Sequence, residues 1–190
     1  MAQITASALA LNLVAVPLTI LIVGVAVAGV TLLPQSIPIG RFEIAWCLAT
    51  IVPLFTLHEL LHAVALVLFA NPPWSAFKFG GHWRQLIVYC HCQQPVPMRA
   101  YRYCTLTPLV LLGPLTILAM LGYPAIWLAL ATAVHLSGCV GDVWMFLRSL
   151  RFPDHFLFLD FPDKIGGEVF QPAGESTQNT ILANNEMVVQ

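Results

Sequence analysis

The chain has 190 residues, of which 58% are hydrophobic and 9% are charged, against roughly 25% charged in an ordinary soluble domain. Its net charge of −1 provides no basic field for nucleic acid, so we expect no nucleic-acid partner. The five cysteines are odd in number and partly lie in apolar segments, which predicts reduced thiols rather than a disulfide framework. The composition predicts an integral membrane protein with the lipid bilayer as its surroundings.

Apolar blocks along the chain predict an all-α polytopic membrane protein with about four transmembrane helices. A helix needs about 20 apolar residues to cross the hydrocarbon, and the first block is longer than a signal-peptide core. Asn71-Pro72-Pro73 ends the second block, and Gly122-Tyr123-Pro124 forms a turn between the last two. The predicted helices cover about 4–33, 43–70, 106–121 and 124–147.

The polar segments predict a loop and a tail on one side of the membrane. In the loop at 71–104, Gly80-Gly81 lies between two apolar runs, which predicts a small β-hairpin or strand pair. Residues 1–150 form the predicted transmembrane domain, and 151–190 a polar C-terminal tail, poorly ordered over 174–179. Seven of the eight Lys and Arg residues lie in this loop or after residue 147. The positive-inside rule then predicts cytoplasmic termini and a cytoplasmic loop, in a multi-pass protein of the inner (plasma) membrane.

The most informative stretch is His58-Glu59-Leu60-Leu61-His62, a zinc-peptidase HExxH motif inside the second predicted helix. The two histidines lie one helical turn apart on one face, so both can reach a single Zn²⁺. Glu59 then lies beside the metal as the general base for a zinc-activated water. Ionisable side chains are costly in a membrane-length apolar segment and by default mark a functional site. The motif predicts one Zn²⁺ per chain.

A catalytic zinc usually takes a third protein ligand. Asp142 is the one acidic residue in the last two predicted helices, and Gly138-Cys139-Val140-Gly141 before it allows close helix approach. At 1.5 Å per residue from the helix ends, His62 lies ~10 Å and Asp142 ~8 Å from the cytoplasmic side. His135 lies ~10 Å further in. We therefore expect Asp142 as the third ligand, with His135 as the alternative.

Cys90-His91-Cys92 lacks the CxxC spacing of a zinc site. In an extended strand the two cysteines face one side and His91 the other, which separates the three side chains. His91 remains a possible substrate contact or alternative ligand.

Two functions fit these residues. The first is a membrane-embedded zinc metalloprotease that hydrolyses peptide bonds of membrane or membrane-proximal protein substrates. The alternative is a non-catalytic metal-binding membrane sensor or scaffold that uses the same His58, His62 and Asp142. Such a protein would not need Glu59, so the presence of Glu59 favours the peptidase.

The HExxH helix, the basic loop with strands and Gly141-Asp142 in the last helix resemble the putative zincin peptidase family of membrane proteins, formerly a domain of unknown function. The resemblance covers roughly residues 40–150. That family is similar to the site-2 protease class of intramembrane zinc metalloproteases. The resemblance implies that His58 and His62 are the histidine ligands, Glu59 the catalytic base and Asp142 the acidic ligand.

Overall fold

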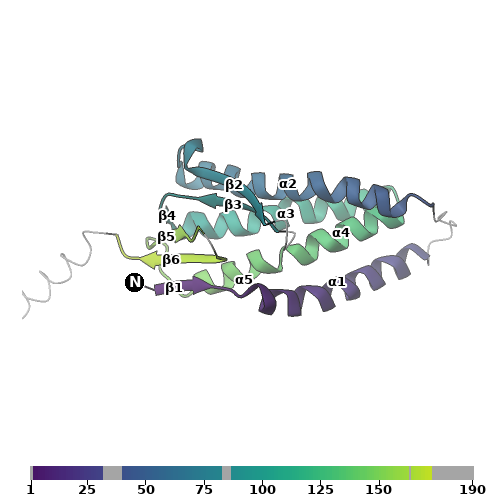
Figure 1. Ribbon diagram of the computed structural model, residues 1–190, viewed down its shortest axis with the longest axis horizontal. Coiled ribbons are helices and arrows are strands. Elements are labelled where there is room, and N and C mark those ends of the chain that lie inside the picture. Colours follow the sequence, from purple (N-terminus) through teal and green to yellow (C-terminus); the bar gives the residue numbers. More distant parts are fainter. Residues whose placement is uncertain (1, 32–39, 83–86, 163, 173–190) are drawn as a thin grey trace, which may run out of the picture.

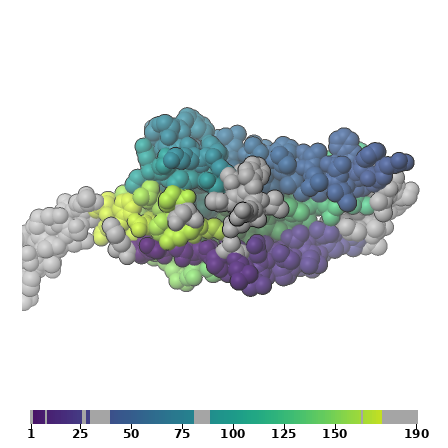
Figure 2. Space-filling model, viewed as in Figure 1, coloured from purple at the N-terminus to yellow at the C-terminus, as the bar shows by residue number. Residues whose placement is uncertain are grey.

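The computed structural model describes residues 2–31, 40–82, 87–162 and 164–172. It is mostly helical, with the strands toward one end of the helix bundle (Figure 1). The molecule is elongated (Figure 2). Helices 8–31, 43–70 and 98–122 and the pair 126–138 and 140–149 run in alternating directions, and the strands 2–5 and 166–170 pair at one end of the bundle (Figure 1). The helices are α1 (Ala8–Thr31), α2 (Glu43–Ala70), α3 (Met98–Gly122), α4 (Ile126–Gly138) and α5 (Val140–Ser149).

Three helices in the described part of the chain are long and apolar enough to cross a membrane: α2, α3, and α4 taken together with α5. The first helix, α1, is apolar over Leu9–Val25, a shorter stretch. On α2, Leu48 is 59%, Val52 68% and Leu68 73% exposed. Continuous apolar surface of this kind marks a face that meets lipid or another apolar partner. The helices therefore support membrane association.

The second predicted helix has the bounds of α2. It ends at Asn71, which takes the left-handed conformation (φ 54°) and donates its amide to the carbonyls of Leu66 and Val67. The prolines at 72 and 73 then prevent the helix from continuing.

The third helix was predicted too short, since α3 begins at Met98 and not at 106. The first turns of α3 contain Arg99 and Arg102. Their charge lowers the hydropathy of this segment, which is why it was assigned to the loop. Arg102 donates to the carbonyls of Ser149 and Phe152 and forms an ion pair with Asp154, so its charge is satisfied at the end of the bundle.

The chain is mostly helical, as predicted, but its described residues also hold six strands in two small antiparallel sheets, more than the one predicted hairpin. The first sheet has the order β1-β6-β5-β4 and joins the start of the chain to the segment after α5. A strand at residues 2–5 therefore precedes the first helix, and residues 157–160 and 166–170 of the predicted tail form strands. The predicted disorder at 174–179 lies outside the described residues. The strands are β1 (Ala2–Thr5), β2 (Phe77–His82), β3 (Ile87–Cys92), β4 (Val96–Pro97), β5 (Leu157–Asp160) and β6 (Gly166–Phe170).

A glycine allows β1 and β6 to pair in this sheet. Gly166 has a φ of +121°, and a side chain there would overlap the carbonyl of Ile4. Phe158 of β5 is 1% exposed and stacks on Tyr101 of α3 with ring centroids 3.8 Å apart. The sheet is thereby fixed to the helix that begins beside it.

The predicted strand pair is present as β2 and β3, which are antiparallel. Gly80 and Gly81 lie inside β2, opposite Tyr89 and Val88, and the connection at 83–86 lies outside the described residues. A side chain at Gly80 would overlap the Tyr89 ring, so the glycine serves cross-strand packing.

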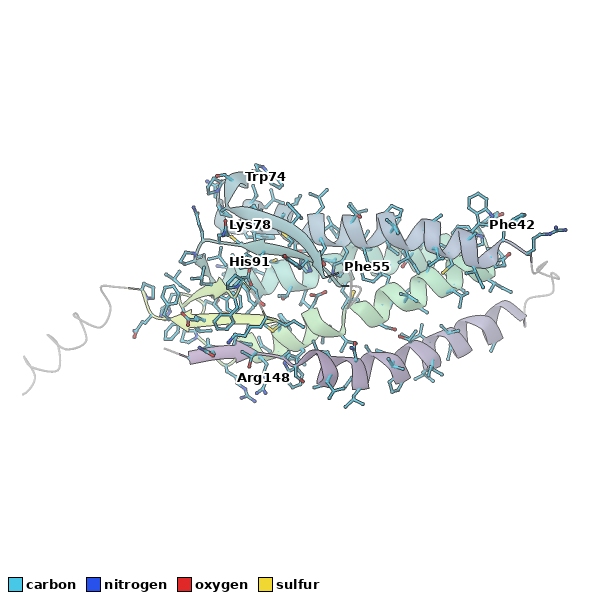
Figure 3. The ribbon with its side chains drawn as sticks, in the orientation of Figure 1. Phe42, Phe55, Trp74, Lys78, His91 and Arg148 are labelled. Atoms are coloured by element: carbon cyan, nitrogen blue, oxygen red, sulfur yellow. The ribbon has the colours of Figure 1, made fainter. Side chains whose placement is uncertain are left out.

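Basic side chains gather at the strand end of the bundle, as the sequence predicted for one side of the membrane. Lys78 and Arg148 lie toward this end together with His91, whereas Phe42 marks the opposite end (Figure 3). The assignment of this end to the cytoplasm stays a prediction.

Candidate metal centre

His58 and His62 face the bundle interior from one side of α2. His58 is 4% exposed and His62 is half-buried, and their rings meet edge to face with centroids 4.8 Å apart. Their Nε2 atoms lie 3.2 Å apart. The four-residue spacing on a helix produces this convergence.

Asp142 reaches the two histidines because α2 and α4 approach closely at Gly138. A side chain at Gly138 would lie 2.9 Å from the Phe55 ring of α2, so only glycine permits this distance. One residue later the helix is interrupted at Cys139, and α5 begins with Asp142 in its first turn. The predicted fourth helix at 124–147 is therefore two helices, and the interruption lies beside the candidate ligand.

The carboxylate of Asp142 contacts both histidines through the nitrogens that face each other. His58 Nε2 lies 3.1 Å from Oδ2, and His62 Nε2 lies 3.4 Å from Oδ1. A tetrahedral zinc with bonds of 2.0–2.1 Å would hold its ligand atoms about 3.3 Å apart. The spacing of the three side chains fits that requirement. Asp142 Oδ2 is also buried and, beyond this ion-pair contact with His58, has no hydrogen-bond partner in the described structure, which leaves a lone pair available to a metal.

The Nδ1 atom of His62 contacts a backbone carbonyl that lacks its usual helical hydrogen bond because of a proline. His62 Nδ1 lies 2.9 Å from the carbonyl oxygen of Cys104 on α3. In a helix this carbonyl would accept from residue 108, but Pro108 has no N–H to donate. Because a carbonyl only accepts, His62 carries its proton on Nδ1 and presents a lone pair at Nε2. Partners of this kind orient metal-binding histidines.

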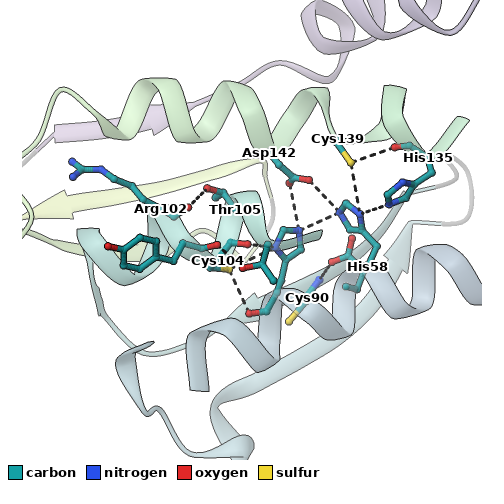
Figure 4. Close-up of polar contacts among 12 residues, drawn as sticks. His58, Cys90, Arg102, Cys104, Thr105, His135, Cys139 and Asp142 are labelled. Atoms are coloured by element: carbon teal, nitrogen blue, oxygen red, sulfur yellow. Dashed lines mark hydrogen bonds and ion pairs between the residues drawn. The ribbon is translucent and has the colours of Figure 1, made fainter. Parts of the chain in front are cut away.

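His135 and Cys139 lie on the far side of the His58 ring from Asp142 (Figure 4). His58 Nδ1 is 3.2 Å from His135 Nε2 and 4.0 Å from Cys139 Sγ. The depth estimate, which separated His135 from the motif by ~10 Å along parallel helices, was therefore wrong. His58 lies one turn deeper than His62, and the close crossing at Gly138 brings His135 against it.

Glu59 is bonded to the strand that lies beside the helix. The amide of Cys90 on β3 donates to Glu59 Oε2 at 2.6 Å. The sequence could not indicate this contact, because every residue except proline has the same backbone donor. It places the hairpin next to the candidate catalytic carboxylate.

His91 is not brought to the histidine pair in the described structure; its Nδ1 lies 3.9 Å from Asp160 Oδ2. Burial lowers the pKa of His91, and it raises the pKa of the Cys90 and Cys92 thiols. Thiolates, not neutral thiols, bind metal ions, so this burial works against a metal site at Cys90-His91-Cys92. Burial also raises the pKa of Asp160 to about 6, which leaves it mainly ionised at neutral pH.

Two sets of three side chains in the described structure bring possible ligand atoms within 4.8 Å of one another. They are His58, Glu59 and His62, and His58, His135 and Cys139. In the first set, an oxygen of Glu59 already accepts a hydrogen bond from the Cys90 amide. The carboxylate of Asp142, which belongs to neither set, contacts both His58 and His62.

The sequence model of a family described as Putative zincin peptidase matches residues 51–157, more than half of the 190 residues. The chain belongs to the putative zincin peptidase family. The family description points to a zinc peptidase, and the matched region contains both candidate ligand sets. Comparisons with curated proteins and with solved structures gave no match.

Proposed function

We propose that the chain is a membrane-embedded zinc metallopeptidase that hydrolyses peptide bonds in membrane or membrane-proximal proteins. The observation that carries the proposal is the convergence of His58 Nε2, His62 Nε2 and the Asp142 carboxylate within 3.1–3.4 Å, at the spacing that zinc requires. These three residues are the proposed ligands of one Zn²⁺ per chain.

The proposed chemistry divides between the metal and the protein. Zinc at this site would supply a Lewis acid that polarises the scissile carbonyl and acidifies a water molecule. Glu59, next to His58 in the chain, accepts the proton from that water and delivers it to the leaving amine. The Cys104 carbonyl and His135 keep the rings of His62 and His58 oriented.

The substrate must reach this site in an extended form, because a helix hides its carbonyls in its own hydrogen bonds. The hairpin beside Glu59 supports binding by strand addition, in which backbone hydrogen bonds hold an extended peptide. The exposed apolar faces of the helices support a substrate that arrives through or along the membrane. This part of the proposal extends the resemblance to site-2 proteases.

Metal removal tests the proposal. Dialysis against a chelator should abolish cleavage of a fluorogenic transmembrane peptide in detergent micelles, and one equivalent of Zn²⁺ should restore it. Elemental analysis should find about one zinc per chain, since three protein ligands form a single site. Cleavage that continues at full rate in the zinc-free protein would refute a zinc peptidase.

The role of His135 provides a second test. His135→Ala removes the partner of His58 Nδ1 but none of the three proposed ligands, so zinc affinity should fall about 10–100-fold, as for other outer partners of metal-binding histidines. His155→Ala, which replaces an exposed histidine after α5, is the control and should bind zinc normally. If His135→Ala loses zinc as completely as His62→Ala does, His135 is itself a ligand.

A further inference from the structure

One edge of β3 is free of β-sheet pairing in the described structure. On its other edge β3 pairs with β2, with His91 opposite Lys78, and the Gln93 amide donates to the Ala76 carbonyl at 2.9 Å. Backbone amides alternate between the two edges of a strand. The amides of Cys90 and Cys92 therefore face away from β2, on what we call the outer edge of β3.

Each outer-edge amide donates to a carboxylate. Cys90 donates to Glu59 Oε2 at 2.6 Å, and Cys92 donates to Asp160 Oδ2 at 3.0 Å. The two carboxylates come from α2 and β5, elements far apart in the chain. Residues two apart in a strand are separated by about 6.6–6.8 Å, so the outer edge is held at two points on one short segment.

Asp160 is well placed to fix this edge. It ends β5, pairs in register with Gly167 of β6, and follows Phe158, which is stacked on Tyr101. Its side chain is 25% exposed. Because an ionised carboxylate accepts stronger hydrogen bonds than a neutral group, its bond to the Cys92 amide ties β3 firmly to the four-stranded sheet.

We propose that Asp160 is a positioning residue for Glu59: it fixes the outer edge of β3 through the Cys92 amide, so that the Cys90 amide holds one oxygen of Glu59. The other oxygen of that carboxylate is then directed to the reacting water. The inference rests on the proposed function in taking Glu59 as the general base. Asp160 lies just beyond the family match, which ends at residue 157.

Kinetics of cleavage test the effect on catalysis. Small displacements of a catalytic group can cost up to about 100-fold in rate, so Asp160→Ala should lower kcat about 10–100-fold and change KM little. Asp160→Asn keeps an oxygen that can accept from the Cys92 amide and should recover most of kcat. Glu168→Ala removes a carboxylate from β6, the strand on the other side of β5, and is the matched control with unchanged kcat.

Hydrogen exchange of the full-length protein in micelles tests the positioning without any cleavage. Asp160→Ala should speed exchange at both Cys90 and Cys92, Glu59→Ala at Cys90 alone, and Asp160→Asn at neither. Unchanged exchange at Cys90 together with unchanged kcat in Asp160→Ala would overturn the proposal. A wild-type protein that cuts no peptide would defeat the proposed function, while the exchange rates would still decide whether Asp160 fixes the outer edge.

Discussion

Glu59→Gln is expected to lower peptide cleavage by a factor of about 10²–10⁴, the usual contribution of a general base, while the protein keeps one zinc per chain. Glutamine has the same shape and can still accept the Cys90 amide through its side-chain oxygen, so the hairpin should stay in place. What it lacks is a basic oxygen that can take a proton. Turnover of the transmembrane peptide and zinc content, measured on the same samples, give the result.

Glu43→Gln is the matched control, because it makes the same replacement at the other end of α2. Glu43 accepts the amides of Gly40 and Trp127 and lies far along the helix from the histidines. The Glu43→Gln variant should cleave the peptide like wild type. If Glu59→Gln keeps both its zinc and its full activity, Glu59 is not the base, and the non-catalytic sensor or scaffold becomes the better account.

Asp142→Ala is expected to weaken zinc binding by more than about 100-fold, the upper end of the loss seen for outer partners of metal ligands. The variant removes a buried carboxylate that contacts His58 Nε2 and His62 Nε2. Its loss leaves His58 Nε2 without this partner in the buried site, so the zinc-free variant should melt lower than the zinc-free wild type. Competition with a chelator of known affinity measures the loss, and a thermal melt separates it from unfolding.

Asp154→Ala controls for the loss of a carboxylate at the strand end of the bundle. Asp154 is largely exposed and pairs with Arg102 rather than with the histidines. The Asp154→Ala variant should bind zinc like wild type. Full zinc binding by Asp142→Ala, combined with loss in Cys139→Ala, would move the site to His58, His135 and Cys139.

Local patterns predicted α2 well. Its apolar length is bounded by Asn71 and two prolines, and its histidine spacing places two ring nitrogens on one face. The approach of Asp142 to the two histidines also followed from the sequence, because Gly138 has no side chain and lets the Phe55 ring of α2 come close. The role of Asp142 as a ligand stays a prediction.

Contacts between distant segments could not be predicted in this way. Strands β1 and β6 pair residues more than 160 positions apart, and each has only four or five residues, too few for a periodic signal. Residues 4 and 5 were therefore assigned to the apolar run of the first helix. The depth estimate for His135 failed because it assumed straight, parallel helices.

One hydrogen-bond partner of the metal-site histidines could have been predicted from the sequence. Pro108 lies within an apolar helix and frees the carbonyl of Cys104, four residues earlier, and His62 donates to that carbonyl. A proline in a membrane helix therefore marks a possible hydrogen-bond acceptor one turn before it. The Cys90 amide that bonds to Glu59 had no such signal.

The central claim is that His58, His62 and Asp142 hold one zinc ion. An anomalous difference map at the zinc absorption edge, from crystals of the zinc-loaded protein, tests it directly. The account predicts a single peak about 2.0–2.2 Å from both Nε2 atoms and from a carboxylate oxygen of Asp142. A peak between His58 Nδ1, His135 and Cys139, with Asp142 unliganded, would contradict it.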